Sequence, residues 1–273
     1  MKHPESQIIE LQERAKQVRR LIVQMLCKAC SGHPGGSLSS SDLVTVLYFA
    51  VLRHRPQEPH WPDRDRFHMS KGHCCPLWYA VLAESGYFPQ EKLWTLRQLG
   101  SMLQGHPDRR TPGVEVGSGS LGQGLSVAGG MCLAGKMDKK DYRVYCLIGD
   151  GEMQEGNIWE GAMSAAHYKL DNLCVMLDFN GFQIDGKVAD VMNVEPVKDK
   201  WKAFGWNTIE IDGHNMKEIL SAYDKAGETK GKPSIIIAHT VKGKGVSFME
   251  NMVDFHGRAP TKEETEQAMR ELA

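Results

Sequence analysis

Three short apolar segments constrain the fold more than any other feature of this sequence. They are Val144–Ile148, Leu173–Leu177 and Ser234–Ala238. Strands that do not alternate between apolar and polar residues are typical of a parallel sheet covered on both faces. Helical patterns at about Asn157–Tyr168 and Asn215–Ala226 lie between them, and such alternation is typical of the α/β class. We therefore predict an α/β fold, a parallel sheet flanked by helices.

Further helices are predicted toward both ends of the chain. Apolar residues recur at helical spacing from about Glu5 to Cys30, and shorter helical patterns cover about 41–52 and 76–85. In the tail, residues 261–273, Thr261 offers an N-cap with Glu264 three residues later. Because no repeat, low-complexity segment or linker divides the 273 residues, we expect one domain, 1–273.

Composition argues against several classes of function. The 33 Lys and Arg nearly balance the 34 Asp and Glu, so nothing favours a nucleic-acid or membrane partner. Without a signal-like N-terminus or an apolar run of roughly 18 to 20 residues, a cytoplasmic chain is expected. Seven cysteines, an odd number, favour free thiols. The pair Cys27 and Cys30 lies in a helical pattern without a second such pair, which disfavours structural zinc.

Polar residues directly follow two of the apolar strands. Gly149-Asp150-Gly151-Glu152 follows the first and Asp178-Phe179-Asn180 the second. Because ligands bind at the carboxyl ends of parallel strands, we expect Asp150 and Asn180 to lie side by side. A carboxylate and an amide oxygen suit Mg²⁺ or Ca²⁺, and Mg²⁺ held by one or two protein oxygens completes its shell with phosphate oxygens and water. The glycines let the backbone approach a phosphate, and the N-terminus of the next helix favours an anion. The alternative for the GDG sequence alone is a plain turn.

With these two motifs paired, the sequence resembles the thiamine diphosphate and metal signature, and the chain resembles the transketolase family from about Ala29 to Pro260. Several blocks occur in the family's order: Ser31-Gly32-His33-Pro34-Gly35-Gly36, Asp65-Arg66-Phe67, Ser70-Lys71-Gly72-His73, Leu96-Arg97-Gln98-Leu99-Gly100, Gly105-His106-Pro107, Gly119-Ser120-Leu121-Gly122-Gln123-Gly124, Gly149-Asp150-Gly151-Glu152-Met153-Gln154-Glu155-Gly156 and Phe255-His256-Gly257.

The resemblance implies roles for individual residues. It implies a metal held by Asp150, Asn180 and the carbonyl of Phe182. It implies a cofactor contacted by His73, Gly119, Leu121, Gly122, Asp150, Gly151, Asn180 and His256. It also implies active-site roles for His33, His73, His106 and His256, since an imidazole with a pKa near about 6.5 can hydrogen-bond sugar hydroxyls and move a proton. Glu155 is implied beside the cofactor and the partner chain, although it could simply be a helix N-terminal carboxylate.

The implied activity is that of a transketolase of the pentose phosphate pathway. Such an enzyme transfers a two-carbon glycolaldehyde unit from a ketose phosphate to an aldose phosphate, using thiamine diphosphate and Mg²⁺ or Ca²⁺. Single-chain transketolases are more than twice this length, and no second half follows Phe255-His256-Gly257 here. We therefore expect a natural N-terminal subunit that is active only with a separate C-terminal, pyrimidine-binding subunit, in an α2β2 heterotetramer.

The sequence departs from the family pattern at two places. Ser120 stands where many single-chain members have proline, and Asn180-Gly181-Phe182 replaces Asn-Lys/Arg-Ile, which weakens the assignment of Phe182. Open alternatives are half of a deoxyxylulose-phosphate synthase-like enzyme, the α chain of a 2-oxoacid dehydrogenase, a split enzyme for a branched or sulfonated sugar, or a non-catalytic cofactor-binding paralogue. The GxGxxG match at Gly117–Gly122 is not expected to bind a dinucleotide because no strand precedes it.

Overall fold

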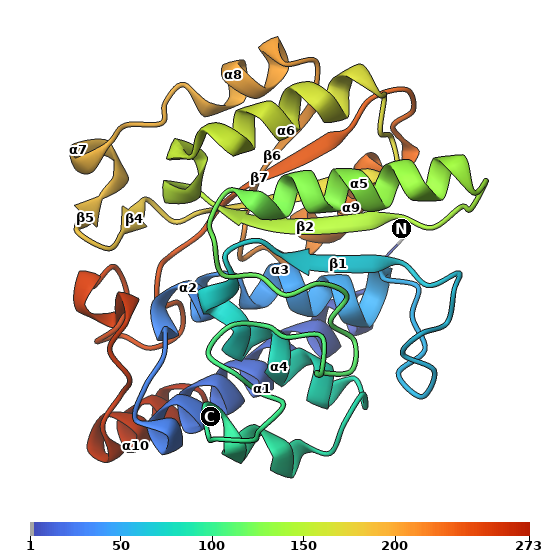
Figure 1. The fold of residues 1–273 in the computed structure, drawn as a ribbon. Coiled ribbons are helices and arrows are strands. Elements are labelled where there is room, and N and C mark those ends of the chain that lie inside the picture. Colours follow the sequence, from blue (N-terminus) through green and yellow to red (C-terminus); the bar gives the residue numbers. More distant parts are fainter. Residues whose placement is uncertain (1–2) are drawn as a thin grey trace.

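The structure, a computed structural model that describes residues 3–273, is built around a five-stranded parallel sheet (Figure 1). The first two residues of the N-terminal segment inspected for a signal lie outside the described residues. The strand order is β1-β2-β3-β7-β6, and every neighbouring pair is parallel. The strands are β1 (Arg66–Met69), β2 (Val144–Gly149), β3 (Leu173–Phe179), β6 (Asn207–Asp212) and β7 (Ser234–His239). The predicted α/β fold and its three apolar strands are confirmed.

Helices cover both faces of the sheet and enclose two apolar cores. Leu147 and Met176 point into one core, whereas their neighbours Ile148 and Leu177 point into the other. This alternation explains why β2 is apolar from Val144 to Ile148 and β3 from Leu173 to Leu177. The first core lies against α1 (Glu5–Ala29), α3 (Ser41–Val46), α4 (Cys75–Glu84) and α9 (Met216–Glu228), and the second against α5 (Gln123–Met137), α6 (Gly156–His167) and α8 (Val197–Ala203).

The predicted helices at the ends of the chain are present. The helix α1 ends at Cys30, which adopts a left-handed conformation. At the other end α10 (Lys262–Glu271) packs on α1. It begins with the predicted pair: Thr261 accepts a hydrogen bond from the Glu264 N–H, and the Glu264 carboxylate accepts one from the Thr261 N–H.

Other elements differ from the sequence prediction. The helix expected over 41–52 is α3 followed by the π-helix η1 (Leu47–Val51). The edge strands β1 and β6 lack a continuous apolar run, so the pattern did not predict them. Neither did it predict α5, whose sequence is rich in glycine. In α5, a Cβ at Gly124 would lie 2.3 Å from the Ser70 hydroxyl, so close packing accounts for that glycine.

All five strands end at one edge of the sheet, on the left in Figure 1. The short helix α2 (Pro34–Ser39), the hairpin β4 (Phe182–Gln183) and β5 (Gly186–Lys187), and the helix α7 (Val188–Val191) gather there. Within residues 3–273, no helix is both long enough and apolar enough to cross a membrane. All seven cysteines are free.

Candidate functional site

A cavity of about 320 Å³ opens at this edge of the sheet. Loops that follow β1, β2, β3 and β7 form its wall, together with the start of α2, the loop before α5 and the short helix η5 (Val253–His256). Most of the sequence-predicted site residues line it: His33, His73, Gly119, Leu121, Asp150, Gly151, Glu155, Asn180, Phe182 and His256.

Two predicted site residues, His106 and Gly122, are not among the cavity-lining residues. His106 lies next to Gly119, because a Cβ at Gly119 would be 3.5 Å from the His106 ring. Gly122, with φ +83°, precedes α5, and a Cβ there would lie 2.7 Å from the Cβ of Glu155. The close packing around Gly122 therefore places Glu155 on the cavity wall at the start of α6.

Asp150 and Asn180 come together as predicted. The strands β2 and β3 are in register at Gly149 and Asp178. The Asp150 carboxylate accepts hydrogen bonds from the Gly151 N–H at 2.7 Å and the Gly181 N–H at 2.5 Å. Gly181 has a φ of +77°, which a glycine adopts without strain. This turn brings the Asp150 carboxylate next to the segment that carries the Asn180 amide and the Phe182 carbonyl.

These oxygen atoms fit a hard divalent cation better than a thiophilic one. Asp150 is only 2% exposed, and burial, followed by the charge of Asp178, raises its pKa to about 7. A bound cation would favour the charged carboxylate and offset that cost. The Phe182 carbonyl already faces a positive group, because Lys242 Nζ lies 3.3 Å from it.

Three of the four predicted histidines form a cluster on the cavity wall. The ring centroids of His33 and His73 are 5.1 Å apart, those of His73 and His256 5.3 Å, and those of His33 and His256 5.7 Å. Lys242 Nζ lies 2.9 Å from His256 Nδ1. Because an ammonium group can only donate, Nδ1 is the acceptor and the proton of the neutral ring is on Nε2.

Burial is the main cause of the lowered pKa values of these histidines, and it keeps their rings neutral. Burial lowers the pKa of His33 and His73 to about 4 and that of His256 to about 3. The next largest causes are His73 for His33, Lys71 for His73 and Lys242 for His256. Burial and then His73 also lower the pKa of His106. In this chain by itself the four rings are therefore neutral at pH 7, with pKa values below the one near about 6.5 of a free imidazole.

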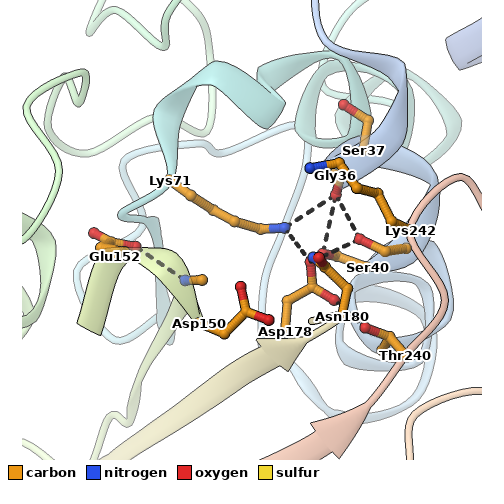
Figure 2. A network of polar contacts seen from close by, with 12 residues as sticks. Gly36, Ser37, Ser40, Lys71, Asp150, Glu152, Asp178, Asn180, Thr240 and Lys242 are labelled. Carbon is orange, nitrogen blue, oxygen red and sulfur yellow. Dashed lines mark hydrogen bonds and ion pairs between the residues drawn. The ribbon is translucent and has the colours of Figure 1, made fainter. Parts of the chain in front are cut away.

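Sequence reasoning missed two buried lysines of the site, Lys71 and Lys242, both of which line the cavity. Lys71 Nζ donates to Asp178 Oδ2 at 2.5 Å and to the Gly36 carbonyl at 3.0 Å (Figure 2). Each lysine comes shortly after a strand, β1 or β7, on the same sheet edge as Asp150 and Asn180. The rule used for those two residues would have found Lys242, which follows the predicted strand β7, but not Lys71, because the pattern did not predict β1.

Glu152 is a second buried group to which sequence reasoning gave no role. Its carboxylate accepts hydrogen bonds from the Ser70 hydroxyl, from the Gly122 N–H at 2.9 Å and from the Gly149 N–H at 3.0 Å. Burial raises its pKa, while these hydrogen bonds act in the opposite direction. Glu152 therefore ties the ends of β1 and β2 to the start of α5 and shapes the cavity without filling it.

Comparison with known protein families identifies this architecture. The family model for the transketolase thiamine diphosphate binding domain matches residues 11–273. The chain belongs to the transketolase family. The resemblance inferred from the sequence is thereby confirmed, and the sheet edge described above is that of a thiamine diphosphate-binding fold.

Two similar transketolase proteins are themselves separate subunits. The chain is 45% identical over 267 residues to an apulose-4-phosphate transketolase subunit of Phocaeicola vulgatus, covering 98% of this chain and 95% of that protein. It is 47% identical over 267 residues to the 6-deoxy-6-sulfo-D-fructose transketolase subunit SqwG of a Clostridium species, covering 97% of each. The chain thus corresponds in length to the N-terminal subunit of a transketolase divided into two chains.

Single-chain transketolases share the fold but are longer. The transketolase of Campylobacter jejuni superimposes with a TM-score of 0.92 at 38% identity, covering 96% of this chain and 42% of that one. Human transketolase is 40% identical over 271 residues, and the chain covers 43% of its length. The chain therefore spans about two fifths of these transketolases, the part that carries the thiamine diphosphate binding domain.

Proposed function

We propose that this chain, together with a separate C-terminal subunit, transfers a two-carbon ketol unit from a ketose phosphate to an aldose phosphate. The similarity over nearly the full length of two proteins named as transketolase subunits carries this proposal. The presence of all four predicted histidines and of Asp150 and Asn180 at one sheet edge supports a catalytic chain over a non-catalytic paralogue.

In this proposal the chain binds the diphosphate end of the cofactor through a divalent cation, Mg²⁺ or Ca²⁺. Asp150, the Asn180 amide oxygen and the Phe182 carbonyl would hold the cation. When bound, thiamine diphosphate supplies the electron sink for breaking and forming the C–C bond. Other residues of the site would contact the cofactor directly or balance its negative charge: Lys71, His73, Gly119, Leu121, Gly151, Lys242 and His256. Gly122 would act through the packing of its loop.

The histidines would act on the sugar. As neutral rings, His33, His73, His106 and His256 can donate one hydrogen bond to a sugar hydroxyl and accept another, and each can take up a proton when a hydroxyl releases one. Their lowered pKa values would rise when anionic cofactor and substrate arrive. Glu155, which is exposed at the start of α6, would lie at the junction with the partner chain.

The proposed assembly is a cytoplasmic α2β2 heterotetramer in which residues 1–273 form one domain and the partner binds the pyrimidine ring. Exposed apolar side chains beside the cavity support a partner at this face. Ile184 lies on the cavity wall and is 63% exposed, and Met192, which directly follows α7, is 60% exposed. A role in the pentose phosphate pathway would follow if the substrates are the common sugar phosphates.

The test is a ketol-transfer assay with a ketose donor, an aldose acceptor, thiamine diphosphate and Mg²⁺. It should be run on this chain alone, on the product of the adjacent reading frame alone, and on their mixture, with phosphorylated and sulfonated sugars in parallel. Activity confined to the mixture is the expected result. Activity of this chain alone would contradict the two-subunit proposal. A mixture that binds cofactor but transfers no ketol unit would indicate another thiamine-dependent reaction.

A further inference from the structure

Asp178 is the point at which four separate segments of the chain meet. Its carboxylate has no exposed surface. Oδ2 accepts hydrogen bonds from Ser39 Oγ at 2.6 Å, Lys71 Nζ at 2.5 Å and Asn180 Nδ2 at 2.8 Å, and Oδ1 accepts one from the Thr240 hydroxyl. The donors come from α2 and from the segments that follow β1, β3 and β7. Figure 2 shows Lys71, Asn180 and Thr240 around Asp178.

The contact with Asn180 has a consequence for the amide of that residue. A carboxylate only accepts hydrogen bonds when it is ionised, so the atom of Asn180 that faces Asp178 must be the nitrogen. The other end of the amide accepts a hydrogen bond from the Phe182 N–H at 3.1 Å and must be the oxygen. The Asn180 oxygen is therefore directed to the side of the Phe182 backbone, and it retains a second lone pair.

Asp178 and Asp150, at the ends of neighbouring strands, differ in how their carboxylates are hydrogen-bonded. Asp178 is paired with Lys71 and carries four hydrogen bonds, so its oxygens are already used within the protein. Among residues 3–273, the Asp150 carboxylate accepts hydrogen bonds from the backbone N–H groups of Gly151 and Gly181 alone. Of these two aspartates, only Asp150 would then have a carboxylate available to a cation. The position of the Asn180 amide beside that cation would depend on Asp178.

We propose that Asp178 is a positioning residue that holds the Asn180 amide with its oxygen available to the divalent cation. The claim about the cation rests on the proposed function, whereas the claim about the amide does not. In this proposal Asp178 acts as the hydrogen-bond acceptor of the Asn180 amide. The alternative is that Asp178 serves only as the counter-charge of Lys71, and the experiment must separate these two roles.

The separation uses two variants in a Lys71→Met background, in which position 178 needs no charge. Asp178→Asn keeps an oxygen that can accept from Asn180, whereas Asp178→Ala keeps none. The first measurement is hydrogen exchange of the Asn180 side-chain amide by NMR on the full chain without ligand. The second is Mn²⁺ affinity, measured in the presence of thiamine diphosphate on the complex with the partner subunit.

We expect the Asn180 amide protons to exchange more slowly than those of the exposed Asn251 in the unmodified chain and in the Asn variant, and to lose this protection in the Ala variant. Mn²⁺ affinity should fall by about 10- to 100-fold from the Asn to the Ala variant, the usual effect of losing a group that orients a ligand. Thr240→Val, which removes only the hydrogen bond to Oδ1, should change neither result.

Equal amide protection and equal Mn²⁺ affinity in the Asn and Ala variants would overturn the proposal and leave Asp178 as a counter-charge. If the unmodified complex binds no Mn²⁺ while the amide protection follows the expected order, the proposed metal site fails and the positioning of Asn180 stands. If the Ala variant does not fold, an Asn180 amide in the unmodified chain that exchanges as fast as that of Asn251 would by itself contradict the inference.

Discussion

At the scale of single residues, two aspartates on neighbouring strand ends have opposite electrostatic environments. Burial and then the charge of Asp178 raise the pKa of Asp150 to about 7. Burial alone would also raise the pKa of Asp178. The charge and hydrogen bond of Lys71 and the hydrogen bonds of Ser39 and Thr240 outweigh burial and lower that pKa to about 2. Asp178 is thus satisfied within the chain, whereas Asp150 gains from an added cation.

Asp150→Ala should abolish divalent-cation binding at the cofactor site, because it removes the only carboxylate of the proposed ligand set. Mn²⁺ titration of the complex with the partner subunit, in the presence of thiamine diphosphate, measures this directly. Asp185→Ala is the matched control, since Asp185 also lines the cavity but is exposed. Retained Mn²⁺ affinity in the Asp150 variant would refute the ligand assignment.

His106→Ala should lower kcat by roughly 100-fold, the lower end of the usual effect for a residue that moves a proton, and leave cofactor affinity unchanged. The reason is that His106 lies next to the cavity-lining Gly119 but does not itself line the cavity. Steady-state kinetics and thiamine diphosphate titration of the reconstituted enzyme separate the two effects. His167→Ala, an exposed histidine at the end of α6, serves as control. A change confined to cofactor affinity would argue against a substrate role.

At the scale of elements, a buried ionic group connects the N-terminal helix to the far edge of the sheet. Arg19 on α1 binds Asp42 on α3 through two hydrogen bonds, of 2.9 and 2.6 Å. His214, in the loop after β6, lies 2.7 Å from Asp42 through Nδ1 and accepts from the Val241 N–H through Nε2. The group therefore joins α1 and α3 to the segment that carries Lys242.

Asp42→Asn should destabilise the chain by about 3 to 5 kcal/mol, because it leaves the buried guanidinium of Arg19 without a counter-charge. Urea unfolding followed by circular dichroism measures this change. The control is Glu10→Gln, which removes an exposed ion pair with Arg14 within α1 and should cost about 0.3 to 0.5 kcal/mol. Similar effects of the two substitutions would show that the Arg19–Asp42 pair contributes little.

At the scale of the whole molecule, buried neutral histidines make stability depend on pH. Burial lowers the pKa of His68, on β1, to about 4, as burial and neighbouring cations do for His33 and His73. Each of these groups binds a proton more readily in the unfolded chain, whose histidine pKa is near about 6.5. The contribution of these neutral histidines to the free energy of unfolding is therefore fully present above that pH and is lost as the pH falls toward 4.

The free energy of unfolding should thus decrease as the pH is lowered from about 6.5 to 4, by at most about 1.4 kcal/mol per pH unit for each such histidine. Thermal unfolding of the ligand-free chain at a series of pH values measures the slope. His68→Gln should make the slope shallower, because its side chain cannot take up a proton. A midpoint that does not change between pH 7 and 4.5 would contradict the neutral assignment of these rings.

The sequence by itself determined the fold class and the centre of the site. Continuous apolar runs place β2, β3 and β7 in the interior of a parallel sheet, and the carboxyl ends of such strands must meet, so Asp150 and Asn180 could be brought together without coordinates. The capping pair Thr261 and Glu264 is equally local, and α10 begins there as predicted.

Only the tertiary structure decided the rest, because it depends on contacts between segments distant in the chain. The edge strands β1 and β6 have no continuous apolar pattern. Two glycines of α5, Gly124 and Gly135, are explained only by close packing, against Ser70 and Tyr142. The Lys71–Asp178 pair joins residues from two strand ends. The neutral state of the site histidines follows from burial, and a sequence does not record which side chains lose contact with water.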